Sequence, residues 1–167
     1  AYGKYVFVGY LWEPLMYFEP ARNFSRGLGL VTNLLYPAQV AGYPAGIRFP
    51  VGYLHHGPLA PILIGLGYKL FGVLDWVPFF INFSLTYLTG LLIYRLAQGL
   101  GGEKTALLAT GFFWSSYMIL EGNQGAPTDA LFTLFLMVGM SSLWESSKPG
   151  RSLIWVAAAG LSLGLAS

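Results

Sequence analysis

The sequence predicts an all-α protein that crosses a membrane several times. Of its 167 residues, 55% are hydrophobic and 10% are charged, and the mean hydropathy is +0.58. A soluble domain carries about 25% charged residues, so these polar side chains are too few to cover a globule of this size. Four apolar stretches approach the roughly 20 residues that a helix needs to cross a bilayer. They cover about residues 76–98, 105–121, 128–145 and 152–167.

The composition excludes several classes of protein. The net charge of +2 and the lack of a Lys/Arg-rich run argue against nucleic-acid binding. The chain has no cysteine, which excludes disulfides and thiolate metal sites. It contains no P-loop, G-x-G-x-x-G or G-x-S-x-G pattern. Aromatic residues make up 17%, and many stand near the ends of the apolar runs, as Trp and Tyr do at membrane interfaces.

The first 75 residues are expected to lie mainly outside the membrane. Residues 1–12 are interpreted as the tail of a first transmembrane helix, and residues 13–75 as an extracytoplasmic loop. Within this loop, "EPLMYFEPARNFSRG" predicts a short amphipathic helix that Pro20 kinks or breaks. The run from Pro58 to Gly72 is short for a span and carries Lys69, so it predicts an amphipathic helix lying at the membrane interface.

The short loops predict the orientation in the membrane. The loops after the first and third spans each carry two basic residues, whereas the loop after the second carries Glu121 and Asp129 and no base. Because cytoplasmic loops are enriched in Lys and Arg, the two basic loops are expected inside and the acidic loop outside, together with residues 13–75. The basic residues are Arg95, Lys104, Lys148 and Arg151.

Asp129 and the two histidines of the chain each allow two interpretations. Asp129 either starts a helix, where a carboxylate favours the positive end of the helix dipole, or orients a ligand in an outward cavity. His55 and His56 are adjacent and point in different directions, so a metal would take one of them, with ligands from elsewhere. Otherwise both are interfacial histidines that are hydrogen-bonded to backbone or water.

The remaining candidates lie in the outer segment. Glu13 and Tyr17 are four residues apart and share a face if the segment is helical, and Arg22 and Arg26 have the same spacing. Arg48 follows further along. Either the segment is a solvated interfacial helix, or Glu13 is a general base beside arginines that hold a phosphate.

Four segments occur in an order typical of one family. They are "EPLMYFEPARNFSRGLGLV", "HHGPLAPILIGLGYKLFG", "YRLAQGLGGEKTALLAT" and "GAPTDALFTLFLM". They resemble, in turn, the first outer loop, the interface helix, a cytoplasmic turn and the second outer loop of the GT-C superfamily of glycosyltransferases. The closest branch holds the dolichyl-phosphate-mannose protein mannosyltransferases and the bacterial lipid A aminoarabinose transferases. The resemblance covers residues 10–167 without the later spans, so we expect an N-terminal fragment.

The resemblance implies a role for each candidate. Glu13 would be the catalytic acidic residue of the first outer loop, where the family more often has Asp, and Asp129 would be that of the second. His56 stands where some members bind a divalent metal ion, so that ion is an implied cofactor. The residues expected to bind the substrate are Tyr17, Arg22, Arg26, Arg48 and His55.

The function implied by the resemblance is that of a multi-pass enzyme of the plasma or inner membrane. It would move a sugar from a polyprenyl phosphate, embedded in membrane lipid, to a protein or glycolipid acceptor on the extracytoplasmic face. The alternative is a non-catalytic subunit that packs in a larger membrane complex, for which "AAAGLSLGLAS" supplies small residues. A transporter is disfavoured because no predicted span carries an ionisable residue near its middle.

Overall fold

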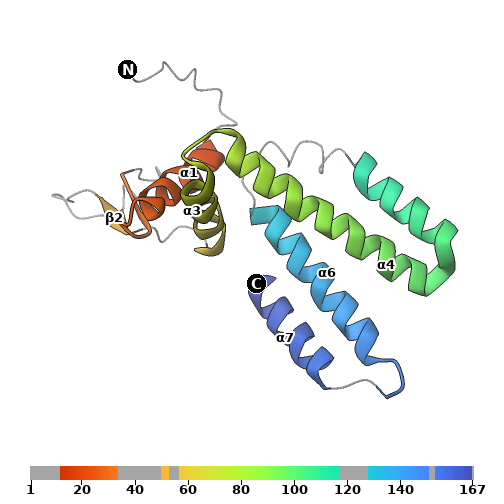
Figure 1. The fold of residues 1–167 in the computed structure, drawn as a ribbon. Helices are drawn as coiled ribbons and strands as arrows, with labels where there is room; N and C mark the ends of the chain where they lie inside the picture. The colour runs from red at the N-terminus through yellow and green to blue at the C-terminus, as the bar shows by residue number, and fades with distance from the viewer. Residues whose placement is uncertain (1–11, 34–49, 53–56, 117–127, 151–152, 167) are drawn as a thin grey trace. The chain divides into compact units, whose positions relative to one another are not determined.

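The computed structural model describes residues 12–33, 50–52, 57–116, 128–150 and 153–166. Within these residues the fold is predominantly helical (Figure 1). The chain divides into two compact units, Ala1–Ile81 and Asn82–Ser167. Apart from Trp12, the predicted tail of a first transmembrane helix lies outside the described residues.

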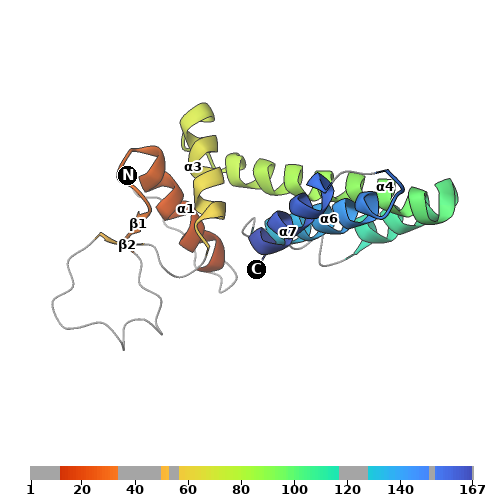
Figure 2. The same cartoon turned by 90° about the horizontal axis from the view of Figure 1, so that it is seen from below.

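The first unit is built on two packed helices, α1 (Trp12–Ser25) and α3 (Leu59–Phe71) (Figure 2). Where they meet, a Cβ placed on Gly65 would lie 2.8 Å from the carbonyl oxygen of Ala21. The missing side chain at Gly65 therefore sets how closely the two helices approach. The almost completely buried hydrophobic residues on the two helices are Met16, Tyr17, Ala21, Ala60, Ile64 and Tyr68.

Helix α3 occupies the run that the sequence predicts, and its end has a local cause. Gly72 has φ of 88°, and its N–H donates to the carbonyl oxygen of Tyr68 at 2.9 Å. Glycine adopts this left-handed conformation without a steric penalty and so ends helices readily. The helix exposes Leu66, Lys69 and Leu70 and buries its opposite side. One buried and one exposed face are typical of an amphipathic helix at the surface of a folded unit.

The sequence predicts that Pro20 kinks or breaks the helix, and a break does not occur. Helix α1 continues through this residue, whose side chain is fully buried together with that of Tyr17. A proline inside a helix removes one backbone hydrogen bond and costs about 3 kcal/mol. Burial of Pro20 offsets this cost, and packing overrides the local preference.

Two short strands of the first unit pair with each other. Strand β1 (Val31–Thr32) pairs antiparallel with β2 (Val51–Gly52), so that Val31 stands opposite Gly52 and Thr32 opposite Val51. Within the predicted loop of residues 13–75, this pairing brings Val51 and Gly52 alongside Val31 and Thr32. The sequence did not predict this pair, because two residues are too few to show an alternating pattern.

Helix α4 (Trp76–Ser115) is two helical arms joined at one residue. Gly102 has φ of 77° and ψ of −175°, which is not helical. Residues 76–101 precede this break and residues 103–115 follow it, and the chain reverses its direction there (Figure 1). The reversal falls in the loop that the sequence predicts between the first two spans.

Trp114 holds the two arms of α4 together. Its ring centroid lies 6.2 Å from that of Phe83 and 6.4 Å from that of Tyr87. A Cβ placed on Gly90 would lie 2.8 Å from the Trp114 Nε1 atom. The glycine therefore leaves the space that the indole fills.

Helices α6 (Thr128–Ser146) and α7 (Ile154–Ala166) lie side by side in the second unit (Figure 1). A Cβ on Gly139 of α6 would lie 2.8 Å from Leu163 of α7. Trp144 approaches the first arm of α4 in the same way, 3.0 Å from a Cβ placed on Gly99. Large side chains thus pack repeatedly against glycines.

One helix of the described residues, α4, is long and apolar enough to cross a membrane. Helix α3 and residues 154–165 are apolar but shorter. Helix α4 also leaves much aromatic surface uncovered: Phe80 is 54% exposed and Phe112 is 75% exposed. Exposed apolar surface of this kind fits contact with lipid, and with the apolar helix it indicates an integral membrane protein.

Candidate functional site

Helix α1 and the turn after it carry the predicted base and three predicted substrate-binding residues. Glu13 lies near the start of α1, and its side chain is outside the described part of the structure, so its role stays a prediction. Tyr17 is 1% exposed, so its ring belongs to the interior of the first unit. Arg26 is exposed and lies just after the end of α1 at Ser25, and its backbone N–H still donates to the carbonyl oxygen of Arg22 at 3.2 Å.

The Glu19 carboxylate joins α1 to the chain that follows it. Its Oε2 atom accepts a hydrogen bond from the Thr32 hydroxyl at 2.6 Å and another from the Asn33 backbone N–H at 3.1 Å. Its Oε1 atom accepts a third from the Asn33 side-chain amide at 2.9 Å. We call this group of three residues the Glu19 clamp. Glu19 is not one of the site residues that the sequence predicts.

A second contact strengthens the same connection. The side-chain amide of Asn23 donates to the carbonyl oxygen of Val31 at 2.8 Å. Asn23 follows Glu19 by four residues, so both side chains project from one face of α1. Both residues of strand β1 and the next residue, Asn33, are therefore tied to this face. The sequence could not predict these contacts, because Thr and Asn residues in a loop show no helical or strand periodicity.

Among the described cations of this unit, Arg22 is more buried than Arg26 and Lys69. It lies in the last turn of α1 and is partly buried. Its Nε atom is buried and has no hydrogen-bond acceptor within the part of the chain that the structure describes. An enclosed guanidinium without a carboxylate partner is suited to bind an anion, since charge-assisted bonds to phosphate are strong and can be bidentate.

The Tyr68 phenol of α3 lies within the electrostatic reach of Arg22. Burial raises the pKa of Tyr68 to about 12, the negative charge of Asp75 adds to the rise, and the Arg22 guanidinium opposes it. Tyr68 is 7% exposed. The phenol is therefore protonated at neutral pH and remains a potential hydrogen-bond donor on the same unit as Arg22.

Asp129 lies in the first turn of α6 and is exposed. Its backbone carbonyl accepts a hydrogen bond from the Thr133 hydroxyl at 2.6 Å. This position agrees with a carboxylate that stabilises the positive end of the helix. Asp129 belongs to the second unit, and its role as a second catalytic acid stays a prediction.

The other predicted site residues, Arg48, His55 and His56, lie outside the described residues. Among the residues that are described, no group of three His, Asp or Glu side chains is placed to hold a metal ion. The divalent ion that the resemblance implies at His56 therefore stays a prediction.

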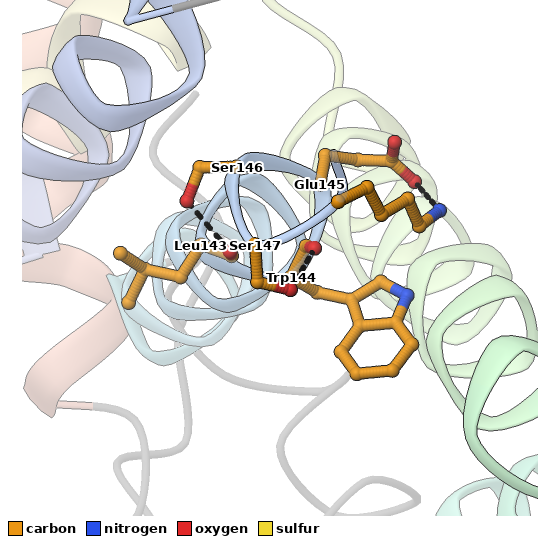
Figure 3. A network of polar contacts seen from close by, with 6 residues as sticks. Leu143, Trp144, Glu145, Ser146 and Ser147 are labelled. Carbon is orange, nitrogen blue, oxygen red and sulfur yellow. Dashed lines mark hydrogen bonds and ion pairs between the residues drawn. The ribbon is translucent and has the colours of Figure 1, made fainter. Parts of the chain in front are cut away.

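The polar contacts at the far end of α6 form a helix terminus (Figure 3). Lys148 pairs with Glu145 at 2.5 Å, and its ammonium lies 5.9 Å from the centroid of the Trp144 ring. The Ser146 and Ser147 hydroxyls donate to backbone carbonyls three residues earlier, at 2.7 and 2.8 Å. These bonds satisfy carbonyls that the end of a helix leaves without partners, so the cluster has a structural purpose.

The chain is similar to proteins of one family. The family model described as dolichyl-phosphate-mannose-protein mannosyltransferase matches residues 55–167. An uncharacterized protein of Aquifex aeolicus (strain VF5) is 30% identical over 112 residues, which are 66% of this chain. They are 22% of that protein, so the chain spans about a fifth of its length. No solved structure matches the chain. Helix α1 and the Glu19 clamp lie before the matched residues.

Proposed function

Because this chain belongs to the dolichyl-phosphate-mannose-protein mannosyltransferase family, which is of the GT-C type, we propose that it transfers a sugar from a polyprenyl phosphate to an acceptor outside the cytoplasm. The observation that carries the proposal for the site is the partly buried Arg22 guanidinium. It lies near a protonated phenol, on a unit that also carries Glu13 and the apolar helix α3. A lipid phosphate combines an anionic group with an apolar chain, and these elements complement both parts.

In the proposed reaction, Glu13 removes the proton from the acceptor nucleophile as this nucleophile attacks the anomeric carbon of the sugar. The bond between that carbon and the phosphate oxygen breaks, and polyprenyl phosphate leaves with the electron pair. Arg22 stabilises the negative charge that grows on the leaving phosphate. One displacement inverts the configuration at the sugar carbon and needs one base, without a second carboxylate as nucleophile.

The proposed membrane arrangement has several crossings. The two arms of α4 would be successive spans, followed by α6 and α7, and α3 would lie along the outer surface with Lys69 toward water. The exposed aromatic residues of α4 support lipid contact. The acceptor is a protein or a glycolipid.

Cysteine labelling tests the orientation, since the chain has no cysteine of its own. A membrane-impermeant maleimide applied to intact cells should label Asn123→Cys in the acidic loop and leave Glu103→Cys in the basic loop unlabelled. Labelling of Glu103→Cys alone would reverse the proposed face of the enzyme.

A change of one charge tests the base. Glu13→Gln preserves the size of the side chain and removes its basicity, so turnover of a polyprenyl-phosphate sugar by the full-length protein should fall about 10²–10⁴-fold. Glu103→Gln is the matched control, because it makes the same change at an exposed residue of α4. Near-normal turnover of Glu13→Gln would show that Glu13 is not the base.

The metal and the subunit alternatives have their own tests. We propose that His56 holds a divalent ion, in which case a chelator should lower the turnover of the wild type and not that of His56→Ala. A non-catalytic subunit would show no transfer in any variant. Of the small residues that suggested such a subunit, Ala159 and Ser162 are buried within this chain, whereas Ala157, Gly160 and Gly164 are exposed.

A further inference from the structure

Glu19 and Arg22 stand three residues apart on α1, a spacing at which opposite charges usually attract each other. Both carboxylate oxygens of Glu19 are instead directed to Thr32 and Asn33. In the part of the chain that the structure describes, the ion pair is the one between Lys148 and Glu145. Glu19 and Arg22 thus have the sequence spacing of a helical ion pair, but they do not form one.

We propose that Thr32 and Asn33 withhold the Glu19 carboxylate from Arg22, and that this leaves the Arg22 guanidinium available to a lipid phosphate. This inference rests on the proposed function, because it assumes that the anion is the phosphate of the sugar donor. Glu19 is then a positioning residue for the binding of the donor and does not touch the reacting atoms.

The hydrogen bonds explain why the carboxylate stays with the loop. Glu19 accepts three of them, and bonds to an ionised acceptor are about twice as strong as bonds between neutral groups. An exposed pair at this helical spacing offers much less, because water screens the charges and two long side chains must be ordered. One donor, the Asn33 backbone N–H, is fixed by the course of the chain.

The surroundings of Arg22 explain why its availability matters. Its Nε atom is buried and has no acceptor among the described residues. A released Glu19 would be the nearest carboxylate along the helix and would compete with any incoming anion. Arg26 is exposed and lies beyond the end of α1, so water and salt screen its charge more than that of the partly buried Arg22. The Glu19 clamp therefore also protects an anion site from a carboxylate of its own helix.

The first experiment measures binding of a short-chain polyprenyl phosphate to the full-length protein in detergent, with the corresponding polyprenol as control. The combined change Thr32→Val and Asn33→Ala removes the two side-chain donors and should raise the Kd for the phosphate about three- to tenfold. Adding Glu19→Gln to this variant removes the competing charge and should restore the Kd to within about twofold. Binding of the polyprenol should not change.

The rescue separates this inference from a merely structural role of the clamp. If the clamp only stabilised the fold, the third substitution would not restore binding. A raised Kd that Glu19→Gln fails to restore would overturn the inference, and so would an unchanged Kd in the double variant.

The second experiment needs no ligand and keeps the inference distinct from the proposed function. The changes Glu19→Gln and Arg22→Gln are combined in a double-mutant cycle, and the thermal unfolding of each variant is followed. Their shifts in Tm should add in the wild type and fail to add in the variant that lacks both donors, because only there do the two side chains interact. If the wild type binds the phosphate no better than the polyprenol, the proposed donor is wrong. In that case additive shifts in both backgrounds would overturn the inference as well.

Discussion

The substitution Gly65→Ala should loosen the packing of α1 against α3. A Cβ at this position would lie 2.7 Å from Cδ1 of Phe24 and 2.8 Å from the carbonyl oxygen of Ala21. The Phe24 ring can rotate away, but the carbonyl belongs to the backbone of α1 and cannot. The helices must therefore separate until this distance reaches about 3.4 Å, where ordinary contact begins.

The structure allows the size of the effect to be worked out. Alanine is favoured over glycine within a helix by about 1 kcal/mol, which opposes the loss. Overpacking a close contact costs about 1–3 kcal/mol, and a gap of 0.5–1 Å forfeits a quarter to a half of the dispersion energy of the lining atoms. The lining includes the fully buried Tyr17 and Ile64, so many contacts are affected. We expect a net loss of about 1–2 kcal/mol.

Thermal unfolding of the full-length protein in detergent measures this loss. A loss of this size should lower Tm by several degrees. Gly160→Ala is the matched control, because Gly160 is also inside a helix and no atom lies within 4 Å of its added Cβ. That variant should be as stable as the wild type or slightly more stable. If Gly65→Ala is no less stable than Gly160→Ala, the close approach of α1 and α3 is not the constraint described above.

Three further predictions follow from single residues. The raised pKa of Tyr68 means that the folded state keeps its proton where the unfolded state loses it. The contribution of the Tyr68 phenol to the free energy of unfolding is therefore fully present below about pH 10. It is lost as the pH rises toward 12, by up to about 2–3 kcal/mol. The variant Tyr68→Phe should show a weaker loss of stability at alkaline pH in urea unfolding curves. Gly102→Ala places a side chain at φ of 77° and should destabilise the hairpin of α4 by about 1–2 kcal/mol, while Gly111→Ala should not. Asp129→Asn should lower the Tm of the protein slightly, because the free energy of unfolding should fall by about 0.3–1 kcal/mol. If the transfer activity falls far more than this loss of stability explains, the catalytic interpretation is favoured over the helix-start interpretation.

The helices of this protein could be predicted because their signals are local. Trp76 opens α4 where the apolar run begins, and α6 begins at Thr128, directly after Pro127. The stop of α3 at Gly72 needs only a residue that tolerates a left-handed backbone. In each case neighbouring residues decide the structure, so the pattern of apolar residues, Pro and Gly is sufficient. The reversal at Gly102 follows the same logic, since "GLGGEK" interrupts two apolar runs.

The structure around the candidate site could not be predicted in this way because distant residues decide it. Strand β1 pairs with residues about 20 positions later, and its contact with α1 depends on Thr32 and Asn33, which have no helical or strand period. The local preference of Pro20 is to kink or break a helix, but α1 continues through it and its side chain is buried. Sequence reasoning identifies which residues are charged and how far apart they stand, but tertiary partners decide which of them meet.

The two glutamates of α1 show why this difference matters for function. Glu13 and Glu19 are the two carboxylates of the helix that the sequence predicts here. The structure gives Glu19 three hydrogen-bond donors, so both of its oxygens are engaged and it is a poor candidate to accept a proton from a substrate. The same three bonds determine the surroundings of Arg22, because they remove the carboxylate that would otherwise neutralise it. These contacts therefore disfavour Glu19 as a base, whereas Glu13 stays the predicted base of this unit and Arg22 its proposed anion site, with Glu19 keeping the two functions apart.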